Sequence, residues 1–126
     1  MAPGFLAEGA VAVTFFASWC PPCREEFMAL RELAEEFPKL KVVAVNVFEQ
    51  WDENDAARMA KYLRLTEPTF PLVKGTAETR RRFGDVDRIP TVFVFAADGR
   101  RVYRFIHHRG ATKMSCLLYT SDAADE

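Results

Sequence analysis

The feature that most restricts how this chain can fold is a pair of cysteines, Cys20 and Cys23, placed between two different kinds of segment. Val11 to Ala17 is a largely apolar run of strand length, whereas apolar residues recur at helical spacing over residues 21–37. A C-x-x-C pair at a strand-to-helix junction is typical of a redox dithiol rather than of half a zinc site. We therefore expect an α/β domain that carries a dithiol where its first strand meets its first helix.

The two prolines between the cysteines set the local chemistry. Pro21 and Pro22 mark the start of the helix, because the first helical positions need no backbone N–H. Cys20 then lies at the helix N-terminus, where unpaired amides stabilise a thiolate and lower its pKa. Since neither proline has an N–H, the nearest downstream donor for the Cys20 sulfur is the amide of Cys23. These positions predict that Cys20 attacks and that Cys23, deeper in the helix, resolves.

Apolar periodicity and turn residues predict the rest of the domain. The expected elements are a strand over 41–47, a helix over 52–65, an extended connector over 68–73, a short helix over 76–83, and strands over 91–96 and 101–107. Asp98-Gly99 is a strong hairpin signal between the last two strands. The chain should form one α/β domain in which helices cross between buried parallel strands.

The helix over 52–65 has a candidate cap and a candidate buried face. Asn54 or Asp55 is expected to cap its N-terminus, because short polar side chains accept hydrogen bonds from the first amides of a helix. The apolar stripe expected to face the sheet consists of Ala56, Met59, Ala60 and Leu63.

Phe15-Phe16-Ala17-Ser18-Trp19-Cys20-Pro21-Pro22-Cys23-Arg24 resembles the active-site segment of thioredoxin-like proteins, above all the extracytoplasmic TlpA/ResA-like branch of thiol-disulfide oxidoreductases. Val86-Asp87-Arg88-Ile89-Pro90-Thr91 and Asp98-Gly99 continue the resemblance, which covers roughly residues 9–110. It implies a thioredoxin-like fold with a mixed four-stranded sheet and helices on both faces. The implied strand order is second, first, third, fourth, with the last two antiparallel to the first two.

The resemblance also implies an activity and its partners. Cys20 and Cys23 would exchange disulfides with partner proteins, in the reducing direction, and an upstream thiol donor protein would restore the dithiol. The alternative is a binding or chaperone module on the same fold whose dithiol is idle. The intact Trp19-Cys20-Pro21-Pro22-Cys23 unit together with Pro90 favours the oxidoreductase.

Four further residues receive supporting roles from the resemblance. Pro90 is expected to be cis beside the dithiol, and Ile89 before it to offer backbone groups to a partner peptide. Trp19 would cover the dithiol as part of a docking surface, be a half-buried core aromatic, or do both. Glu26 would take part in thiol proton transfer, or, with Glu25 in the first helical turn, act only on the helix dipole.

A metal site is the competing interpretation of the cysteines, and structural zinc needs four ligands. The remaining candidates are His107, His108 and Cys116, and adjacent histidines on one strand point to opposite faces. We therefore expect no metal and no cofactor.

Composition limits the class of protein. The chain has 126 residues, of which 49% are hydrophobic, and a formal net charge of −1, so a single domain is expected and nucleic acid is not an expected partner. There is no apolar run of membrane-spanning length and no recognisable signal peptide. The resemblance implies an extracytoplasmic or periplasmic location, and a cytoplasmic one is the alternative.

Both ends of the sequence depart from the expected pattern. We expect residues 1–113 to be a thioredoxin-like domain that is truncated at both ends, so that the closing helix expected near Gly110 is cut short. Residues 114–126 are expected to be a non-native tail, because residues 116–126 resemble a translated sequencing adapter.

Overall fold

A mixed five-stranded sheet organises residues 8–106, the part of the chain that the computed structural model describes. The strands lie in the order β3-β2-β1-β4-β5, and their bounds are β1 Val11–Phe16, β2 Lys41–Asn46, β3 Leu72–Lys74, β4 Thr91–Phe95 and β5 Arg101–Ile106. The helices are α1 Pro21–Glu36, α2 Glu53–Thr66 and α3 Ala77–Arg82. β1, β2 and β3 are parallel to one another, whereas β4 is antiparallel to both β1 and β5. The thioredoxin-like α/β fold is thus confirmed.

The sheet has one strand more than the sequence predicted. Part of the segment expected to be an extended connector pairs with β2 as β3, so the four-stranded sheet is corrected to five strands. Three residues are too few to show an apolar periodicity. This strand is therefore recognised only from its pairing with β2. Ala44 N donates to Pro71 O at 3.0 Å, and Gly75 N donates to Asn46 O at 2.7 Å, so hydrogen bonds hold both ends of β3 to β2.

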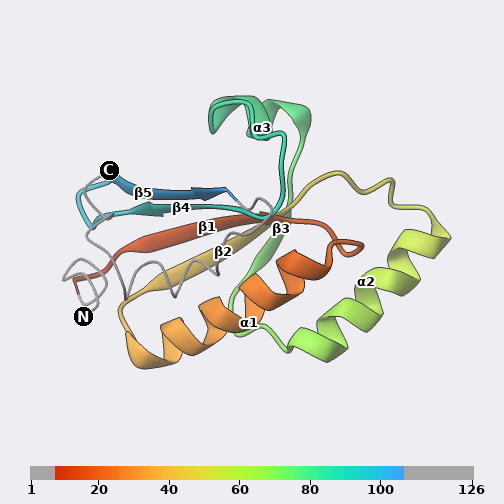
Figure 1. The fold of residues 1–126 in the computed structure, drawn as a ribbon, viewed down its shortest axis with the longest axis horizontal. Helices are drawn as coiled ribbons and strands as arrows, with labels where there is room; N and C mark the ends of the chain where they lie inside the picture. Colours follow the sequence, from red (N-terminus) through yellow and green to blue (C-terminus); the bar gives the residue numbers. More distant parts are fainter. Residues whose placement is uncertain (1–7, 107–126) are drawn as a thin grey trace.

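Two layers of side chains cover the two faces of the sheet. α1 and α2 lie side by side on one face, and α3 stands on the opposite side (Figure 1). The first face packs Phe16, Val92 and Val94 against Phe27 and Leu30 of α1. The central strands β1 and β4 are buried on both faces, as their continuous apolar runs predicted, whereas the edge strands β3 and β5 have exposed residues.

The second face depends on the segment that follows α3. None of the residues of α3 is buried, and Phe83, directly after the helix, packs on the sheet instead. Its ring centroid lies 5.1 Å from that of Phe15 and 5.5 Å from that of Phe93. Val86 completes this cluster, so the chain between α3 and β4 is held against the sheet just before it reaches Ile89 and Pro90.

α2 differs from its prediction in its cap and in its buried face. The N-cap is Asp52, whose side chain accepts from Asp55 N at 2.8 Å, so neither Asn54 nor Asp55 is the cap. Of the predicted stripe, Met59 is buried and Leu63 is partly buried against the core, whereas Ala56 and Ala60 are exposed and Tyr62 and Thr66 are buried instead. The aromatic ring of Tyr62 stacks on Phe16 at 5.4 Å, and this contact decides which side of the helix faces the sheet.

Several predictions fall on residues 1–7 and 107–126, outside the described part of the chain. They concern His107, His108, Cys116, the truncated closing helix and the non-native tail. The hairpin at Asp98-Gly99 is confirmed, since it joins antiparallel β4 and β5, with Gly99 at φ +88°.

Candidate functional site

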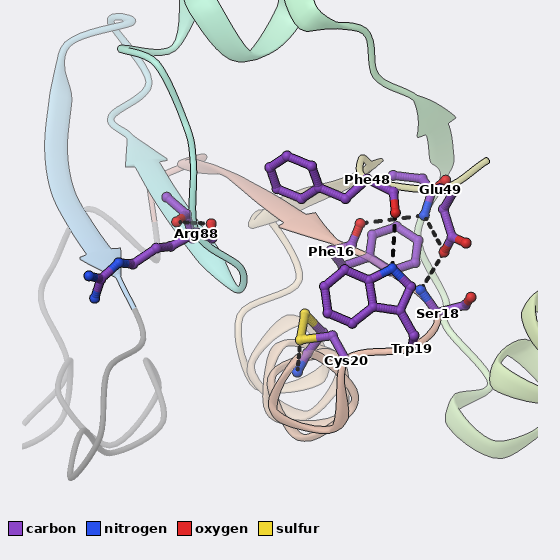
Figure 2. Close-up of a disulfide and its surroundings, with 10 residues drawn as sticks. Phe16, Ser18, Trp19, Cys20, Phe48, Glu49 and Arg88 are labelled. Carbon is purple, nitrogen blue, oxygen red and sulfur yellow. Dashed lines mark hydrogen bonds between the residues drawn. A yellow bond between two sulfur atoms is a disulfide. The ribbon is translucent and has the colours of Figure 1, made fainter.

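The dithiol segment lies where β1 ends and α1 begins. Cys20 is the N-cap of α1, with Pro21 and Pro22 at the first two helical positions. The Cys20 sulfur accepts a hydrogen bond from Cys23 N at 3.3 Å, the donor that the sequence predicted (Figure 2). Cys20 and Cys23 form a disulfide, with their Cα atoms 5.3 Å apart. Both cysteines are buried, but Cys20 is 5% exposed and Cys23 is fully enclosed, so the N-terminal cysteine is the more accessible one.

The glutamates of α1 do not lie where the sequence placed them. Because α1 begins at Pro21, its first turn contains no acidic residue, and Glu25 and Glu26 fall in the second turn. Glu25 is exposed, whereas Glu26 is 2% exposed, one turn after Cys23 on the buried side of the helix. The first-turn helix-dipole role is therefore wrong, and a buried carboxyl close to Cys23 in the helix is what the structure provides.

The Trp19 indole lies beside the disulfide and is tethered by its nitrogen. Its Nε1 donates to the carbonyl oxygen of Phe48 at 2.9 Å, across the loop that follows β2 (Figure 2). About half of Trp19 is exposed, so its ring is a surface feature held in one orientation rather than a core aromatic. Phe48, with φ +59°, is itself 40% exposed.

Pro90 lies at the same edge of the sheet as the dithiol. The Ile89–Pro90 peptide bond is cis. Because Thr91 pairs with Phe15 at the carboxyl end of β1, the residues before Thr91 reach the edge where Trp19 and Cys20 follow β1. A groove of about 480 Å³ lies at this edge, between Trp19 and the segment that precedes Pro90. Its walls are Trp19, Phe48, Asp87, Arg88 and Ile89.

A buried carboxylate fixes the backbone just before Trp19, and the sequence reasoning missed it. Glu49 Oε1 accepts hydrogen bonds from Ser18 N and from Asn46 Nδ2, and the Glu49 side chain is 1% exposed (Figure 2). Arg58 of α2 lies 3.6 Å from the other Glu49 oxygen and donates to Ser18 Oγ at 3.0 Å. The proximity of Ser18 and Glu49 could have been predicted from the sequence. Each follows the carboxyl end of one of the parallel strands β1 and β2, and such ends meet at one edge of a sheet.

Asp55 connects this network to the start of α2. Its carboxylate accepts from the backbone amides of Gln50 and Trp51 and pairs with Arg58. Although burial by itself raises the pKa of Asp55, the two amides and Arg58 outweigh it and hold that pKa below its ordinary value. Asp55 therefore stays ionised and ties together the loop that carries Phe48 and Glu49.

The arrangement suits dithiol chemistry. Among the described residues, no group of three or more His, Cys, Asp or Glu side chains could hold a metal ion. Cys20 is slightly exposed whereas Cys23 is not, a backbone amide points at the Cys20 sulfur, and Cys23 is bonded to it from the buried side. Such a pair can exchange disulfides with a second molecule that reaches Cys20.

Comparison with known proteins places the chain in a family. Residues 4–116 match the redoxin family, and the chain therefore belongs to it. Thioredoxin from Chlamydia pneumoniae is 36% identical over 67% of this chain and 78% of its own length. The thioredoxin-like protein YneN from Bacillus subtilis is 31% identical over 82% of this chain, and the match spans 58% of YneN.

Solved structures agree with this assignment. A thiol:disulfide interchange protein of the thioredoxin family from Chlorobium tepidum superposes with a TM-score of 0.66 at 28% identity, over 81% of this chain and 72% of its own. StoA from Bacillus subtilis gives a TM-score of 0.61 at 25% identity, over 79% and 74%. The predicted resemblance to thioredoxin-like thiol-disulfide proteins is confirmed, and these relatives fit the TlpA/ResA-like branch.

Proposed function

We propose that this protein is a protein-disulfide reductase that works through Cys20 and Cys23. The observation that carries the proposal is the position of Cys20 as the N-cap of α1, with its sulfur facing an amide and the buried Cys23 behind it. A thiolate at a helix N-terminus is stabilised, so Cys20 is the nucleophile at neutral pH. The homologues are thiol-disulfide oxidoreductases of the thioredoxin family, which supports the class of reaction.

The reaction transfers two electrons to the partner. The Cys20 thiolate attacks one sulfur of the partner disulfide, forming a mixed disulfide and releasing the other partner sulfur as a thiolate. Cys23, after losing its proton, attacks the Cys20 sulfur and displaces the second partner thiolate. The partner thiolates take up protons, and the protein is left with the Cys20–Cys23 disulfide. An upstream protein dithiol restores the reduced form by the same exchange in reverse.

Several residues support this exchange in our proposal. Trp19 and Ile89 line the groove beside the dithiol and would hold the partner chain, with Ile89 offering backbone groups before the cis bond to Pro90. Glu26, buried one turn after Cys23, would accept the proton of that thiol. Pro21 and Pro22 leave the Cys23 amide as the donor nearest the Cys20 sulfur.

We further propose an extracytoplasmic location, which rests on the resemblance to the TlpA/ResA-like branch. None of the helices between residues 8 and 106 is long and apolar enough to cross a membrane. Cell fractionation of the native host with an antibody against the chain tests the location, and recovery in the cytoplasmic fraction would contradict it.

Trapping tests the division of roles between the cysteines. Cys23→Ala should accumulate mixed disulfides with partner proteins, because the resolving step is lost, whereas Cys20→Ala should accumulate none. Non-reducing gels of the two variants read out the result. Equal trapping by both variants contradicts the mechanism, and absence of trapping together with no reduction of a model protein disulfide favours an idle dithiol.

The reduction potential of the Cys20–Cys23 pair tests whether the protein reduces or oxidises its partners. A reductase should have a potential near that of thioredoxin, about −270 mV, rather than near that of the oxidant DsbA, about −120 mV. Equilibration of the chain with glutathione or dithiothreitol buffers measures it. A value near the oxidant end would reverse the proposed direction and leave the oxidoreductase class intact.

A further inference from the structure

A second hollow opens beside Cys20, away from the groove that contains Ile89. It has a volume of about 290 Å³ and lies between the start of α1 and the face of α2. Trp19 lines both hollows. The second hollow includes Cys20 itself in its wall, together with Arg24, Arg58, Lys61 and Tyr62.

The wall of this hollow carries positive charge that the protein leaves uncompensated. None of the described residues that line it is acidic. Arg58 is paired with Asp55 and Glu49 and is neutralised by them. Arg24 and Lys61, by contrast, are exposed and form no ion pair within residues 8–106. Two cations that are unpaired within the described residues, one from each helix, therefore line the same hollow as Cys20.

The floor of the hollow adds no negative charge. The ring of Tyr62 is 4% exposed and packs between Phe16 and Phe27. Burial raises the pKa of Tyr62 well above its usual value, and the nearby charge of Arg24 offsets this only in part, so the phenol keeps its proton. An anionic group in the hollow would meet two cations, an uncharged floor and the Trp19 ring.

We infer that this hollow binds a carboxylate of the partner, an Asp or Glu side chain that lies next to the partner cysteine attacked by Cys20. This inference rests on the proposed function. The position of Cys20 in the wall requires the partner's sulfur to approach there, which places neighbouring partner side chains in or beside the hollow. A volume of about 290 Å³, at the small end of the range of about 300–1,000 Å³ typical of small-molecule sites, has room for one side chain of the partner.

Recognition of the carboxylate must be separated from a general effect on Cys20. Arg24 and Lys61 also stabilise the Cys20 thiolate, so their removal should slow exchange with every disulfide. A carboxylate-specific contact instead changes the ratio between an acidic and a neutral substrate. This ratio is the quantity to measure.

The experiment uses the reduced full chain and short peptides, each closed by one intramolecular disulfide and differing only in Glu, Gln or Lys beside one cysteine. Stopped-flow measurement gives the second-order rate constant for oxidation of the chain by each peptide. We expect the Glu peptide to react about three- to tenfold faster than the Gln peptide at low salt, as for one or two exposed ion pairs, and the Lys peptide to react slowest.

Variants assign this preference to the hollow. In the double variant Arg24→Gln/Lys61→Gln, the ratio of Glu to Gln rates should fall to about one. Arg64→Gln removes an exposed cation from the same helix as Lys61 but outside the hollow, and should leave the ratio unchanged. The ratio should also fall toward one at high salt, since screening weakens exposed pairs.

Four results would overturn the inference. Equal rates for the Glu and Gln peptides would show that the hollow does not bind the carboxylate. A preference for the Glu peptide that survives in the double variant would show the same. Faster reaction with oxidised glutathione than with any peptide would assign the hollow to a small acidic disulfide instead of a protein partner. Failure to reduce any peptide would overturn the proposed function, and with it this inference.

Discussion

At the level of single residues, the two cysteines differ in what surrounds each sulfur. Cys20 caps α1 and accepts from the amide of Cys23, whereas Cys23 is enclosed by the helix and the sheet. An anion at a helix N-terminus is stabilised by the unpaired amides there, and a buried thiol lacks that benefit. We therefore expect Cys20 to be the more reactive thiol because of its place at the helix N-terminus, and Arg24 and Lys61 beside it act in the same direction.

Selective alkylation checks this difference. Treatment of the reduced chain with less than one equivalent of iodoacetamide should label Cys20 well ahead of Cys23, because the more exposed and more acidic thiol reacts faster. Peptide mapping by mass spectrometry separates both labels from that on Cys116. In urea the two cysteines should react at similar rates, and preferential labelling of Cys23 in the folded protein would contradict the assignment.

At the level of elements, the loop between β2 and α2 is fixed by carboxylates. Glu49 holds the backbone of Ser18, and Asp55 holds the backbone of Gln50 and Trp51, with Arg58 between the two acids. This loop presents Phe48, to which the Trp19 indole is tethered. The orientation of the Trp19 ring beside the dithiol therefore depends on residues about thirty positions further along the chain.

The pH dependence of stability tests the role of Asp55. Its folded-state pKa lies below the ordinary value of 3.8, so its stabilising effect is present above that pH and is lost as the pH falls through the lowered value. Asp55→Asn should lower Tm at pH 7, and the difference from the wild type should shrink in acid below pH 3.8. Asp98→Asn, an exposed turn residue, is the control. A difference in Tm that stays constant down to pH 2 would contradict the argument.

The edge strand β3 provides another prediction at this level. A Cβ added to Gly75 would lie 2.6 Å and 2.8 Å from methyl groups of Val45 and Val47 and 3.1 Å from Asn46 O. Gly75→Ala should therefore lower the free energy of unfolding by about 1–3 kcal/mol, as overpacking does elsewhere. Val73→Ala, within β3 just before Gly75 and with a half-exposed side chain, should change it by about 0.5 kcal/mol or less. Urea denaturation measures both, and equal effects would contradict the close approach.

At the level of the whole molecule, an aromatic cluster joins both large helices to the sheet. The Phe27 ring of α1 contacts Phe16 of β1, Tyr62 of α2 and Phe70, with centroid distances of 4.6, 5.1 and 5.2 Å. Phe27 is 1% exposed and lies one turn beyond Cys23. The same packing that stabilises the fold thus positions the helix that carries the dithiol.

Truncation of this ring tests its weight in global stability. Phe27→Ala should cost about 3–5 kcal/mol, a large share of the roughly 5–15 kcal/mol that keeps a domain folded. Met28→Ala, at the neighbouring and 41% exposed position, should stay within about 0.5 kcal/mol of the wild type. Urea denaturation of the two variants measures both changes in the free energy of unfolding. A small effect of Phe27→Ala would show that the cluster is not the centre of the core.

The local features of the site could be predicted from the sequence, because they depend on neighbours along the chain. The strand β1, the start of α1 at two prolines and the hydrogen bond from Cys23 to the Cys20 sulfur all follow from a few adjacent residues. The hairpin at Asp98-Gly99 is equally local. Such features are set by dihedral preferences and missing N–H groups, which act whatever the rest of the chain does.

Other features exist only when distant segments meet. β3 is a strand because β2 offers it hydrogen-bonding partners, and α2 turns Tyr62 rather than its alanines to the sheet because Phe16 offers a ring. The N-cap of α2 is Asp52 and not the predicted Asn54 or Asp55. The Asp55 carboxylate instead binds the amides of Gln50 and Trp51 and the side chain of Arg58. The sequence by itself determined where the dithiol lies, whereas only tertiary packing decided which charged and aromatic side chains surround it, because that choice depends on contacts between elements remote in sequence.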